Sequence, residues 1–121
     1  MDKISIAEYH KLIGKKKNKY GNIKASNHRG SFDSIKEKTY EEELYLQYKA
    51  KKIKNYSCQV RFKLTINDHP LCTYIADFVV THLDEHVEII DVKSVATQTP
   101  VFKLKWKLLK ALYPTYQYTI I

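Results

Sequence analysis

The sequence has few of the residues that break regular structure or brace small folds. It contains three glycines, three prolines and two cysteines in 121 residues. So few glycines and prolines favour helices and strands over long loops. The spacing of Cys58 and Cys72 fits neither a zinc-binding pair nor a C-x-x-C redox motif. Both cysteines are therefore expected to be small buried hydrophobic residues in a reducing compartment.

The sequence also lacks a long hydrophobic run. No segment approaches the roughly 20 consecutive apolar residues that span a bilayer. The first residues, MDKISIAEYHKL, lack the apolar stretch and cleavage site of a signal peptide. We therefore expect a cytoplasmic protein with no membrane partner.

Positive charge is abundant. Lysine and arginine number 21 against 13 aspartates and glutamates, a formal net charge of +8, and 44% of the residues are hydrophobic. The length and the hydrophobic fraction indicate one globular domain with a moderate core. The charge favours a polyanionic partner, nucleic acid before an anionic membrane, over a merely solvated basic surface.

Residues 1–31 are predicted to form a basic N-terminal arm, followed by a folded domain over 32–121. The arm is polar and lacks clear periodicity, apart from a short apolar stretch in 4–13 that predicts a brief helix. Lys15, Lys16 and Lys17 form a run that either lies along a phosphate backbone or remains a solvated tail.

The domain is predicted to contain two helices and four strands. Ser34 and Glu37 have the spacing of a capping box, which predicts a helix over 35–52. Alternating apolar residues predict strands over 57–66, 71–83 and 87–95, and Pro100 opens a helix that runs to residue 113 before a last strand at 116–121. The order indicates a mixed sheet covered by two helices, an α/β fold of the α+β mixed-sheet type.

Two details of these elements are specific enough to test. A four-residue turn at 67–70 would place Ile66 opposite Leu71 and Cys58 opposite Val79, a register that excludes a disulfide with Cys72. The helix over 100–113 has two stripes at helical spacing. The predicted core stripe consists of Val101, Leu104, Leu108 and Leu112. The other stripe, which is either solvated or bound to phosphates, consists of Lys103, Lys107 and Lys110.

Two aspartates stand inside apolar strands. Side chains alternate along a strand, so Ile89, Asp91 and Lys93 share one face, and Asp77 lies within YIADFVV. Aspartate is depleted in strands, and an uncompensated buried carboxylate is costly. Three explanations are open: an ion pair with Lys93, a strand end that reaches solvent, or a divalent-metal site.

The metal site has a chemical rationale. Hydrolysis of a phosphodiester requires an activated water and neutralisation of the charge that develops at phosphorus. A Mg²⁺ or Mn²⁺ ion held by Asp77 and Asp91 supplies both. Lys93 would orient or deprotonate the attacking water and stabilise the developing charge.

These segments resemble a known group of enzymes. The aspartate of YIADFVV, the D-x-K of IIDVKS and a glutamate in an upstream helix are similar to the PD-(D/E)XK nuclease superfamily, whose restriction-endonuclease-like core has the order helix, three-strand meander, helix, strand. KYGNIK, FDSIKE and VFKLKWKLLKALYP extend the resemblance to a family of small phage and prophage proteins within it. The likeness covers residues 19–121.

The resemblance implies a role for each matching residue. Asp77, Asp91 and the backbone carbonyl of Val92 would bind the metal, Lys93 would be the catalytic lysine, and Glu37 would be the helical acid that orients the attacking water.

Two further residues bear on the same site. Gln59 matches an accessory polar position. Glu41, one turn after Glu37 on the same helix face, is a rival for the helical acid. Ala76 replaces the proline of the superfamily motif, which leaves the metal ligands intact.

The implied activity is a Mg²⁺- or Mn²⁺-dependent endonuclease of phage DNA metabolism in the host cytoplasm. Its substrate would be double-stranded or branched DNA, including Holliday junctions, and it would act as a homodimer. An RNA substrate would use the same chemistry. The alternative is a DNA- or partner-binding module that keeps the fold without cleaving.

Overall fold

The computed structural model describes residues 25–121. The chain divides between Thr39 and Tyr40 into two compact units, and each unit is described by itself. The predicted helix in residues 4–13 and the run of Lys15, Lys16 and Lys17 lie outside the described residues.

The first unit contains a two-stranded hairpin. β1 (Ala25–Asn27) pairs antiparallel with β2 (Gly30–Phe32), with Ser26 opposite Ser31. Inside the turn the backbone N–H of Arg29 donates to Asn27 Oδ1 at 2.8 Å. The last residues of the predicted arm are thus in regular structure. The arm and domain limits, 1–31 and 32–121, stay a prediction.

Helix α2 (Ile35–Lys49) begins in the first unit and ends in the second. The N–H of Glu37 donates to Ser34 Oγ at 3.0 Å, which confirms the predicted N-cap. The helix ends three residues before the predicted position 52. Lys51 has a left-handed backbone (φ 59°) and the N–H of Lys52 bonds to the carbonyl of Gln47 at 2.9 Å, a common way to close a helix C-terminus.

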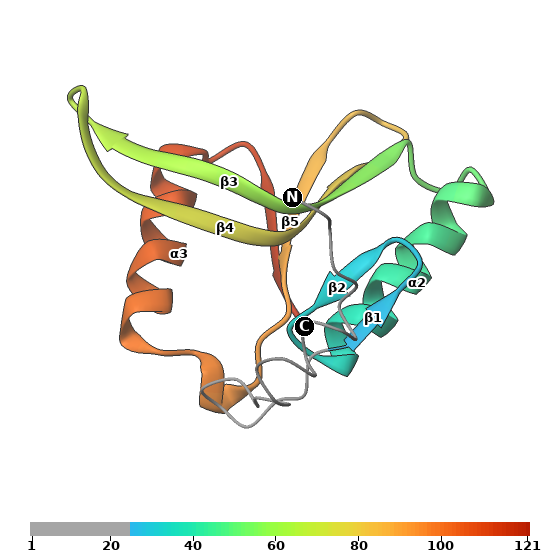
Figure 1. Ribbon diagram of the computed structural model, residues 1–121. Coiled ribbons are helices and arrows are strands. Elements are labelled where there is room, and N and C mark those ends of the chain that lie inside the picture. The colour runs from blue at the N-terminus through green and yellow to red at the C-terminus, as the bar shows by residue number, and fades with distance from the viewer. Residues whose placement is uncertain (1–24) are drawn as a thin grey trace, which may run out of the picture. The chain divides into compact units, whose positions relative to one another are not determined.

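The second unit is built on a four-stranded mixed sheet with the order β3-β4-β5-β6 (Figure 1). Its strands are β3 (Asn55–Ile66), β4 (His69–Thr81), β5 (Val87–Asp91) and β6 (Gln117–Ile120). β3, β4 and β5 form an antiparallel meander, and β6 adds parallel to β5. The predicted mixed α+β architecture with two helices is therefore confirmed.

The predicted register of the first hairpin is wrong. The turn contains two residues, Asn67 and Asp68, instead of four, and both have positive φ (49° and 64°). This turn geometry suits the twist of a hairpin, and Asn and Asp tolerate it. Ile66 therefore pairs with His69, and Leu64 pairs with Cys72.

The observed register determines where the two cysteines lie. Cys58 pairs with Phe78 instead of Val79. Cys72 of β4 pairs with Leu64, which is six residues after Cys58 on β3, so the two cysteines cannot face each other. Cys72 is half-buried, but Cys58 is exposed, contrary to the expectation that both are buried.

Helix α3 (Pro100–Leu112) packs on the β3–β4 half of the sheet, after a short 3₁₀ turn η1 (Val95–Thr97). Pro100 occupies the first turn as predicted, and Thr99 Oγ1 accepts from the N–H of Phe102 at 3.1 Å. The residues at the centre of the core beneath this helix come from β3, β4, β5 and α3. They are Leu64, Tyr74, Ala76, Ile89, Phe102, Trp106 and Leu109.

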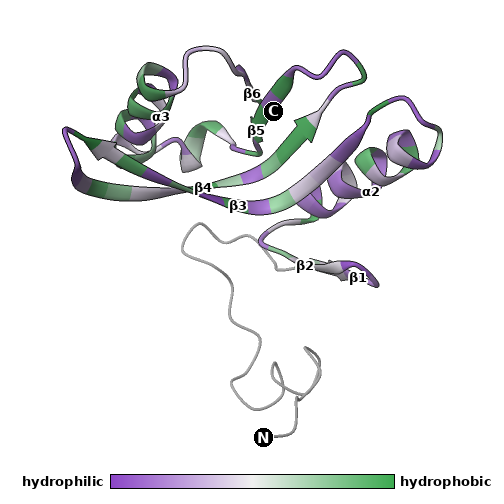
Figure 2. Ribbon diagram, turned by 90° about the horizontal axis from the view of Figure 1, so that it is seen from above, coloured by the Kyte–Doolittle hydropathy of each residue, from purple (hydrophilic) through white to green (hydrophobic). Residues whose placement is uncertain are grey.

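The predicted core stripe of α3 is only partly correct. Val101 and Leu104 are 63% and 68% exposed, whereas Phe102, Trp106 and Leu109 are buried. Aromatic rings decide this orientation, because Trp106 contacts both Tyr74 and Tyr118, with ring centroids 5.9 and 5.4 Å apart. Figure 2 shows the alternation of hydrophobic and polar residues around α3 and the hydrophobic character of β5.

Candidate functional site

The register of the sheet brings Asp77 and Asp91 together. The β4–β5 ladder ends where Phe78 pairs with Ile90, so Asp77 and Asp91 are the next residue on each strand. The N–H of Val92, which follows Asp91, donates to Asp77 Oδ2 at 2.8 Å, so the two aspartates are neighbours. Both side chains are buried, with 8% and 1% exposed.

The alternation of faces along β4 changes at Asp77. Side chains on one face of a regular strand are two residues apart. Tyr74, Ala76 and Val79 all pack in the core next to α3, although Ala76 and Val79 are three residues apart. Phe78 contacts the ring of Tyr40 from α2 instead, with centroids 5.5 Å apart. The neighbouring strand is irregular at the same level, because Gln59 has a left-handed backbone (φ 53°). Such strain in a non-glycine residue costs about 1–3 kcal/mol and tends to accompany functional sites.

Asp77 is held by its neighbours on both sides. The N–H of Val92 donates to Asp77 Oδ2 at 2.8 Å, and Gln59 Nε2 donates to Oδ1 at 3.4 Å. Both donors come from flanking strand segments, so the carboxylate is fixed across the sheet. Gln59, predicted as an accessory residue, is therefore adjacent to the first aspartate.

Asp91 has the opposite environment. Both carboxylate oxygens are buried and have no hydrogen-bond partner within the described part of the chain. Burial raises the pKa of Asp91 to about 6, while Lys93 and the backbone amides of Asp77 and Val92 act in the lowering direction. Those amides lower the pKa without meeting the geometry of a hydrogen bond to the Asp91 oxygens. A buried carboxylate in this state is expensive unless a cation compensates it.

Lys93 lies beside Asp91, just beyond the end of β5. Its Nζ is 3.9 Å from Asp91 Oδ1, and its side chain is 27% exposed. The ammonium also lies 5.3 Å from the ring centroid of Phe102, at the start of α3. The backbone continues the parallel ladder here, since Lys93 N–H donates to the Ile121 carbonyl at 3.0 Å. Of the three explanations for D-x-K, a loose ion pair is present, and the strand-end explanation fails for Asp91 because it is buried.

The two candidate helical acids are both buried, with 3% of Glu37 and 1% of Glu41 exposed. Glu41 belongs to the same unit as the aspartates, and its Oε2 accepts from the Tyr56 hydroxyl of β3 at 2.8 Å. Glu37 lies in the first unit, in the first turn of α2. The assignment of either residue as the helical acid of the site stays a prediction.

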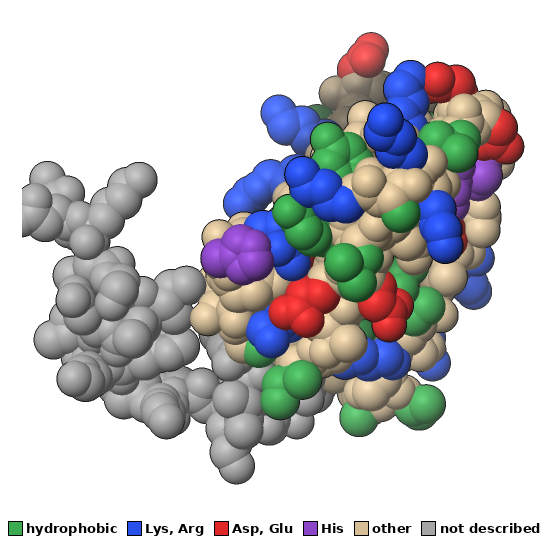
Figure 3. Space-filling view, turned by 90° about the vertical axis from the view of Figure 1, so that its right-hand side faces the viewer, with side chains coloured by type: hydrophobic (Ala, Val, Ile, Leu, Met, Phe, Trp, Pro, Cys, Tyr) green, Lys and Arg blue, Asp and Glu red, His purple; other side chains and the backbone are tan. Residues whose placement is uncertain are grey.

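The predicted nucleic-acid contacts on α3 are on its surface. Lys103, Lys107 and Lys110 are all exposed. Lys110 Nζ packs 5.7 Å from the Trp106 ring centroid and 5.9 Å from that of Tyr118. Figure 3 shows a face on which lysine and arginine side chains alternate with acidic ones. Net charge alone therefore does not define the surface that would meet a polyanion.

Metal-binding capacity centres on the aspartate pair. Within residues 25–121 no set of three or more histidine, cysteine, aspartate and glutamate side chains is arranged to hold a metal ion. Two carboxylates nevertheless match the way Mg²⁺ is commonly held, with its other positions left to water and backbone oxygens. Val92, whose carbonyl was predicted as a ligand, follows Asp91 directly and is half-buried.

A second polar cluster lies at the β4–β5 turn. Glu88 is at its centre: His82 Nε2 is 2.7 Å from Oε1, and Thr119 Oγ1 donates to Oε2 at 2.5 Å. His86 is hydrogen-bonded to Asp84 and its ring stacks on His82 with centroids 4.1 Å apart. The H-x3-H-x-E spacing across a turn was the available signal.

The fold and the site together define a mixed α+β protein with a buried aspartate pair across adjacent strands. The model of a family described as "Protein of unknown function (DUF1064)" matches residues 17–121, so the chain belongs to this family. No curated protein and no solved structure matches the chain. Neither α2 nor α3, the helices of the described residues, has the length and apolar sequence that a membrane span needs.

Proposed function

We propose that the protein is a metal-dependent endonuclease that hydrolyses DNA phosphodiesters on a restriction-endonuclease-like core. The observation that carries the proposal is the buried carboxylate of Asp91, whose two oxygens have no hydrogen-bond partner among the described residues. Asp77 lies beside it, because the N–H of Val92, the residue after Asp91, donates to Asp77 Oδ2. A purely structural carboxylate would be expected to have donors. Oxygens that stay without donors are ready to bind a cation.

The residues fit a divalent ion. Carboxylate oxygens are the ligands that Mg²⁺ and Mn²⁺ prefer, and Asp77, Asp91 and the Val92 carbonyl would hold the ion. When bound, the ion acts as a Lewis acid at a phosphoryl oxygen and makes a water more acidic. Its charge would also compensate the carboxylate of Asp91, which burial otherwise disfavours.

The chain's own groups have separate tasks. Val92 N–H and Gln59 orient Asp77, so that one of the two carboxylates is fixed before substrate arrives. Lys93 is the only one of these groups that carries positive charge. Its ammonium, next to Asp91 and partly exposed, is placed to stabilise charge on a phosphate or to exchange a proton with the attacking water.

DNA is the polyanion that best suits this chemistry and the net charge of +8. Lys103 and Lys107 on α3, the helix whose first turn is in contact with Lys93 through Phe102, would contact phosphates next to the scissile bond. A branched or junction substrate and a homodimer would follow from the resemblance to small nucleases of this kind.

The test is cleavage of supercoiled plasmid and of a four-way junction, each with Mg²⁺, Mn²⁺ or EDTA. Wild type should cut only with metal, and Asp91→Ala should not cut. The matched control is Asp68→Asn, which removes an exposed carboxylate in a left-handed turn position that Asn also tolerates.

The alternative is a binding module without catalysis. Equal DNA binding by wild type and Asp91→Ala, with no cleavage of DNA or RNA under any metal, would establish that alternative and end the nuclease proposal. Cleavage of RNA alone would keep the chemistry and change the substrate.

A further inference from the structure

A hollow of about 410 Å³ lies at the corner where α2 turns into β3. Its lining comes from the end of α2, the turn to β3 and the loop after β4. The residues are Tyr48, Lys49, Lys51, Ile53, Lys54 and Leu83. All of them belong to the second unit.

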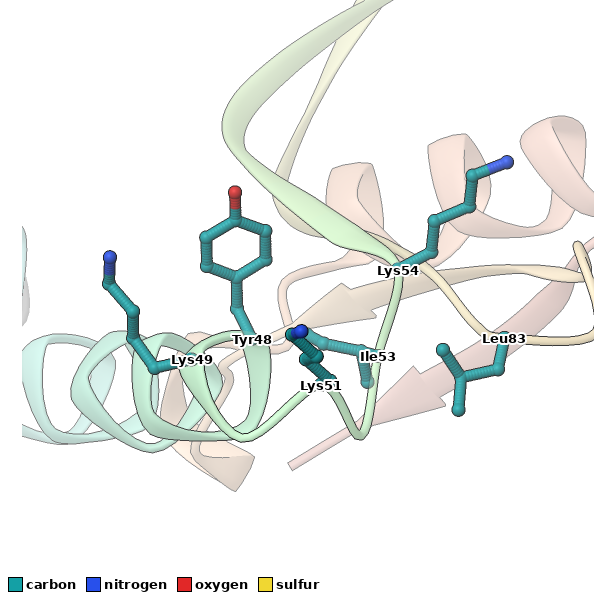
Figure 4. A pocket seen from close by; sticks show the side chains of 6 residues that line it. All are labelled: Tyr48, Lys49, Lys51, Ile53, Lys54 and Leu83. Atoms are coloured by element: carbon teal, nitrogen blue, oxygen red, sulfur yellow. The ribbon is translucent and has the colours of Figure 1, made fainter.

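The lining combines cations with apolar and aromatic surface. Figure 4 shows Tyr48, Lys49 and Lys54 extending to the same side, with Ile53 between them and Leu83 on the far side. Ile53 is buried and forms the floor, whereas the Tyr48 side chain is 43% exposed. The Tyr56 ring contacts the Tyr48 ring edge-on, with centroids 6.1 Å apart, so Tyr48 forms an aromatic side of the hollow.

The contacts that Lys54 and Lys49 make within the protein are weak enough to be replaced by a bound anion. Lys54 Nζ pairs with Glu85 Oε1 at 2.6 Å, but the two side chains are 50% and 66% exposed. An ion pair this exposed exchanges readily for another anion. Lys49 Nζ lies 5.5 Å from the ring centroid of Tyr45, a contact that leaves its charge accessible.

Part of this charge has an ordinary structural explanation. Lysines near a helix C-terminus interact favourably with the helix dipole. That explanation covers Lys49, which is in the last turn of α2. It does not explain Lys54, which directly precedes β3 and lines the same hollow from the other side. Nor does it explain the exposed ring of Tyr48, which lies between Lys49 and Lys54.

We propose that this hollow binds an unpaired strand of nucleic acid, with phosphates on Lys49, Lys51 and Lys54 and a base against Tyr48. Cationic grooves beside aromatic rings are the usual means of holding single strands without sequence preference. A flat anionic membrane would not require a concave surface with an aromatic wall. The identity of the ligand rests on the proposed function, since a nuclease that opens or trims branched DNA exposes such strands.

The test measures binding in EDTA, so that cleavage plays no part. Fluorescence anisotropy of a labelled oligothymidylate of about 20 nucleotides, longer than the usual site size of one binding groove, is followed over a salt series. The groove variant is Lys49→Gln, Lys51→Gln, Lys54→Gln. The control variant is Lys36→Gln, Lys52→Gln, Lys63→Gln. It removes the same charge from exposed lysines outside the hollow, including Lys52 in the same turn.

We expect the groove variant to bind roughly tenfold more weakly and to lose about 2 from the slope of log affinity against log salt, at about 0.7 per phosphate contact. The control should stay within about twofold, the scale of a general charge effect. Tyr48→Ala should weaken binding without changing the salt slope, whereas Tyr48→Phe should bind like wild type.

Equal losses in the groove and control variants would overturn the proposal, because the effect would then be one of net charge. A wild type that does not bind the oligonucleotide would overturn it as well. The proposal would also be overturned if the groove variant lost binding to phosphatidylserine vesicles but bound the oligonucleotide like wild type. Binding measured in EDTA does not depend on DNA cleavage at the aspartate site. A failure of this inference can therefore be distinguished from a failure of the nuclease proposal.

Discussion

The region where β4 pairs with β5 has an acidic cluster near each of its two ends, and the two clusters differ in one respect. At the turn end, Glu88 accepts from Thr119 and Gln117 and lies against His82. At the other end, the oxygens of Asp91 have no hydrogen-bond partner among the described residues. Both clusters lie on the same pair of strands, and only one is electrostatically complete.

The difference separates a structural cluster from a candidate functional one. A carboxylate with several donors holds strands together, because its charge is compensated by the protein itself. The Glu88 cluster links the β4–β5 turn to β6 in this way. The Asp91 carboxylate accepts no such hydrogen bonds, and burial disfavours its charged form, so it is the group that a cation would complete in the proposed site.

The largest expected effect is on cleavage. Asp77→Asn and Asp91→Asn should each lower the rate with Mg²⁺ by about 10²–10³-fold, the scale for losing one preorganised electrostatic group. The double variant should be little worse than either single one, because residues that act as a unit are strongly non-additive. Glu88→Gln, at the complete cluster, should change the rate by less than about threefold.

Single-turnover rates on plasmid DNA measure this contrast, with circular dichroism as the check that each variant is folded. A loss with Glu88→Gln as large as with Asp91→Asn would remove the distinction between the two clusters.

The next effect is on stability in EDTA. The folded-state pKa of Asp91, about 6, exceeds its ordinary 3.8, so between these pH values the folded chain holds a proton that the unfolded chain has lost. The stability contributed by Asp91 is therefore fully present below about pH 3.8 and is lost as pH rises through about 6. The difference in pKa corresponds to about 3 kcal/mol.

Urea unfolding at pH 4 and pH 7 tests this sign. The free energy of unfolding of Asp91→Asn, relative to wild type, should improve by about 2–3 kcal/mol between pH 4 and pH 7. The same comparison for Glu88→Gln supplies the control. An Asp91→Asn difference that is independent of pH would show that the carboxylate is already compensated by the protein.

Metal should reverse that deficit. A divalent ion at 100 times its dissociation constant stabilises the folded state by about 2.7 kcal/mol. Mn²⁺ and Mg²⁺ should therefore raise the melting temperature of wild type and of Thr119→Val, but not that of Asp91→Asn. Differential scanning fluorimetry with EDTA as the reference measures the shift, and an equal rise in all three variants would place the ion elsewhere.

The smallest effect belongs to the complete cluster. Thr119→Val removes one donor to Glu88 while leaving Gln117 and His82, so it should cost about 0.5–1.5 kcal/mol. Cleavage should stay near the wild-type rate. Chemical denaturation gives the cost, and a value near zero would mean that the Glu88 cluster does not hold β6.

Local signals in the sequence were sufficient for much of the fold. Ser34 and Pro100 fixed where the two helices begin, because capping chemistry involves residues close in sequence. Period-two alternation located the strands of the meander. The same reasoning failed for the β3–β4 turn, where the left-handed backbones of Asn67 and Asp68 shortened the loop and moved the register.

Helix α3 shows the limit of periodicity. Val101 and Leu104 satisfied the apolar spacing but are exposed, and Phe102 and Trp106 are buried in their place. The helix has two overlapping apolar stripes, and spacing does not choose between them. The ring contacts of Trp106 with Tyr74 and Tyr118 choose the buried stripe.

The sequence by itself determined the order of the elements, the excess of positive charge and the presence of two aspartates where strands should be apolar. Tertiary structure alone decided which acidic groups were completed, because their donors come from distant segments: Val92 reaches Asp77 across 15 residues, and Thr119 reaches Glu88 across 31. A carboxylate's charge is compensated by neighbours in space. An aspartate in an apolar strand indicates from the sequence that a buried charge needs a partner. The packing of the sheet determines whether the protein supplies that partner.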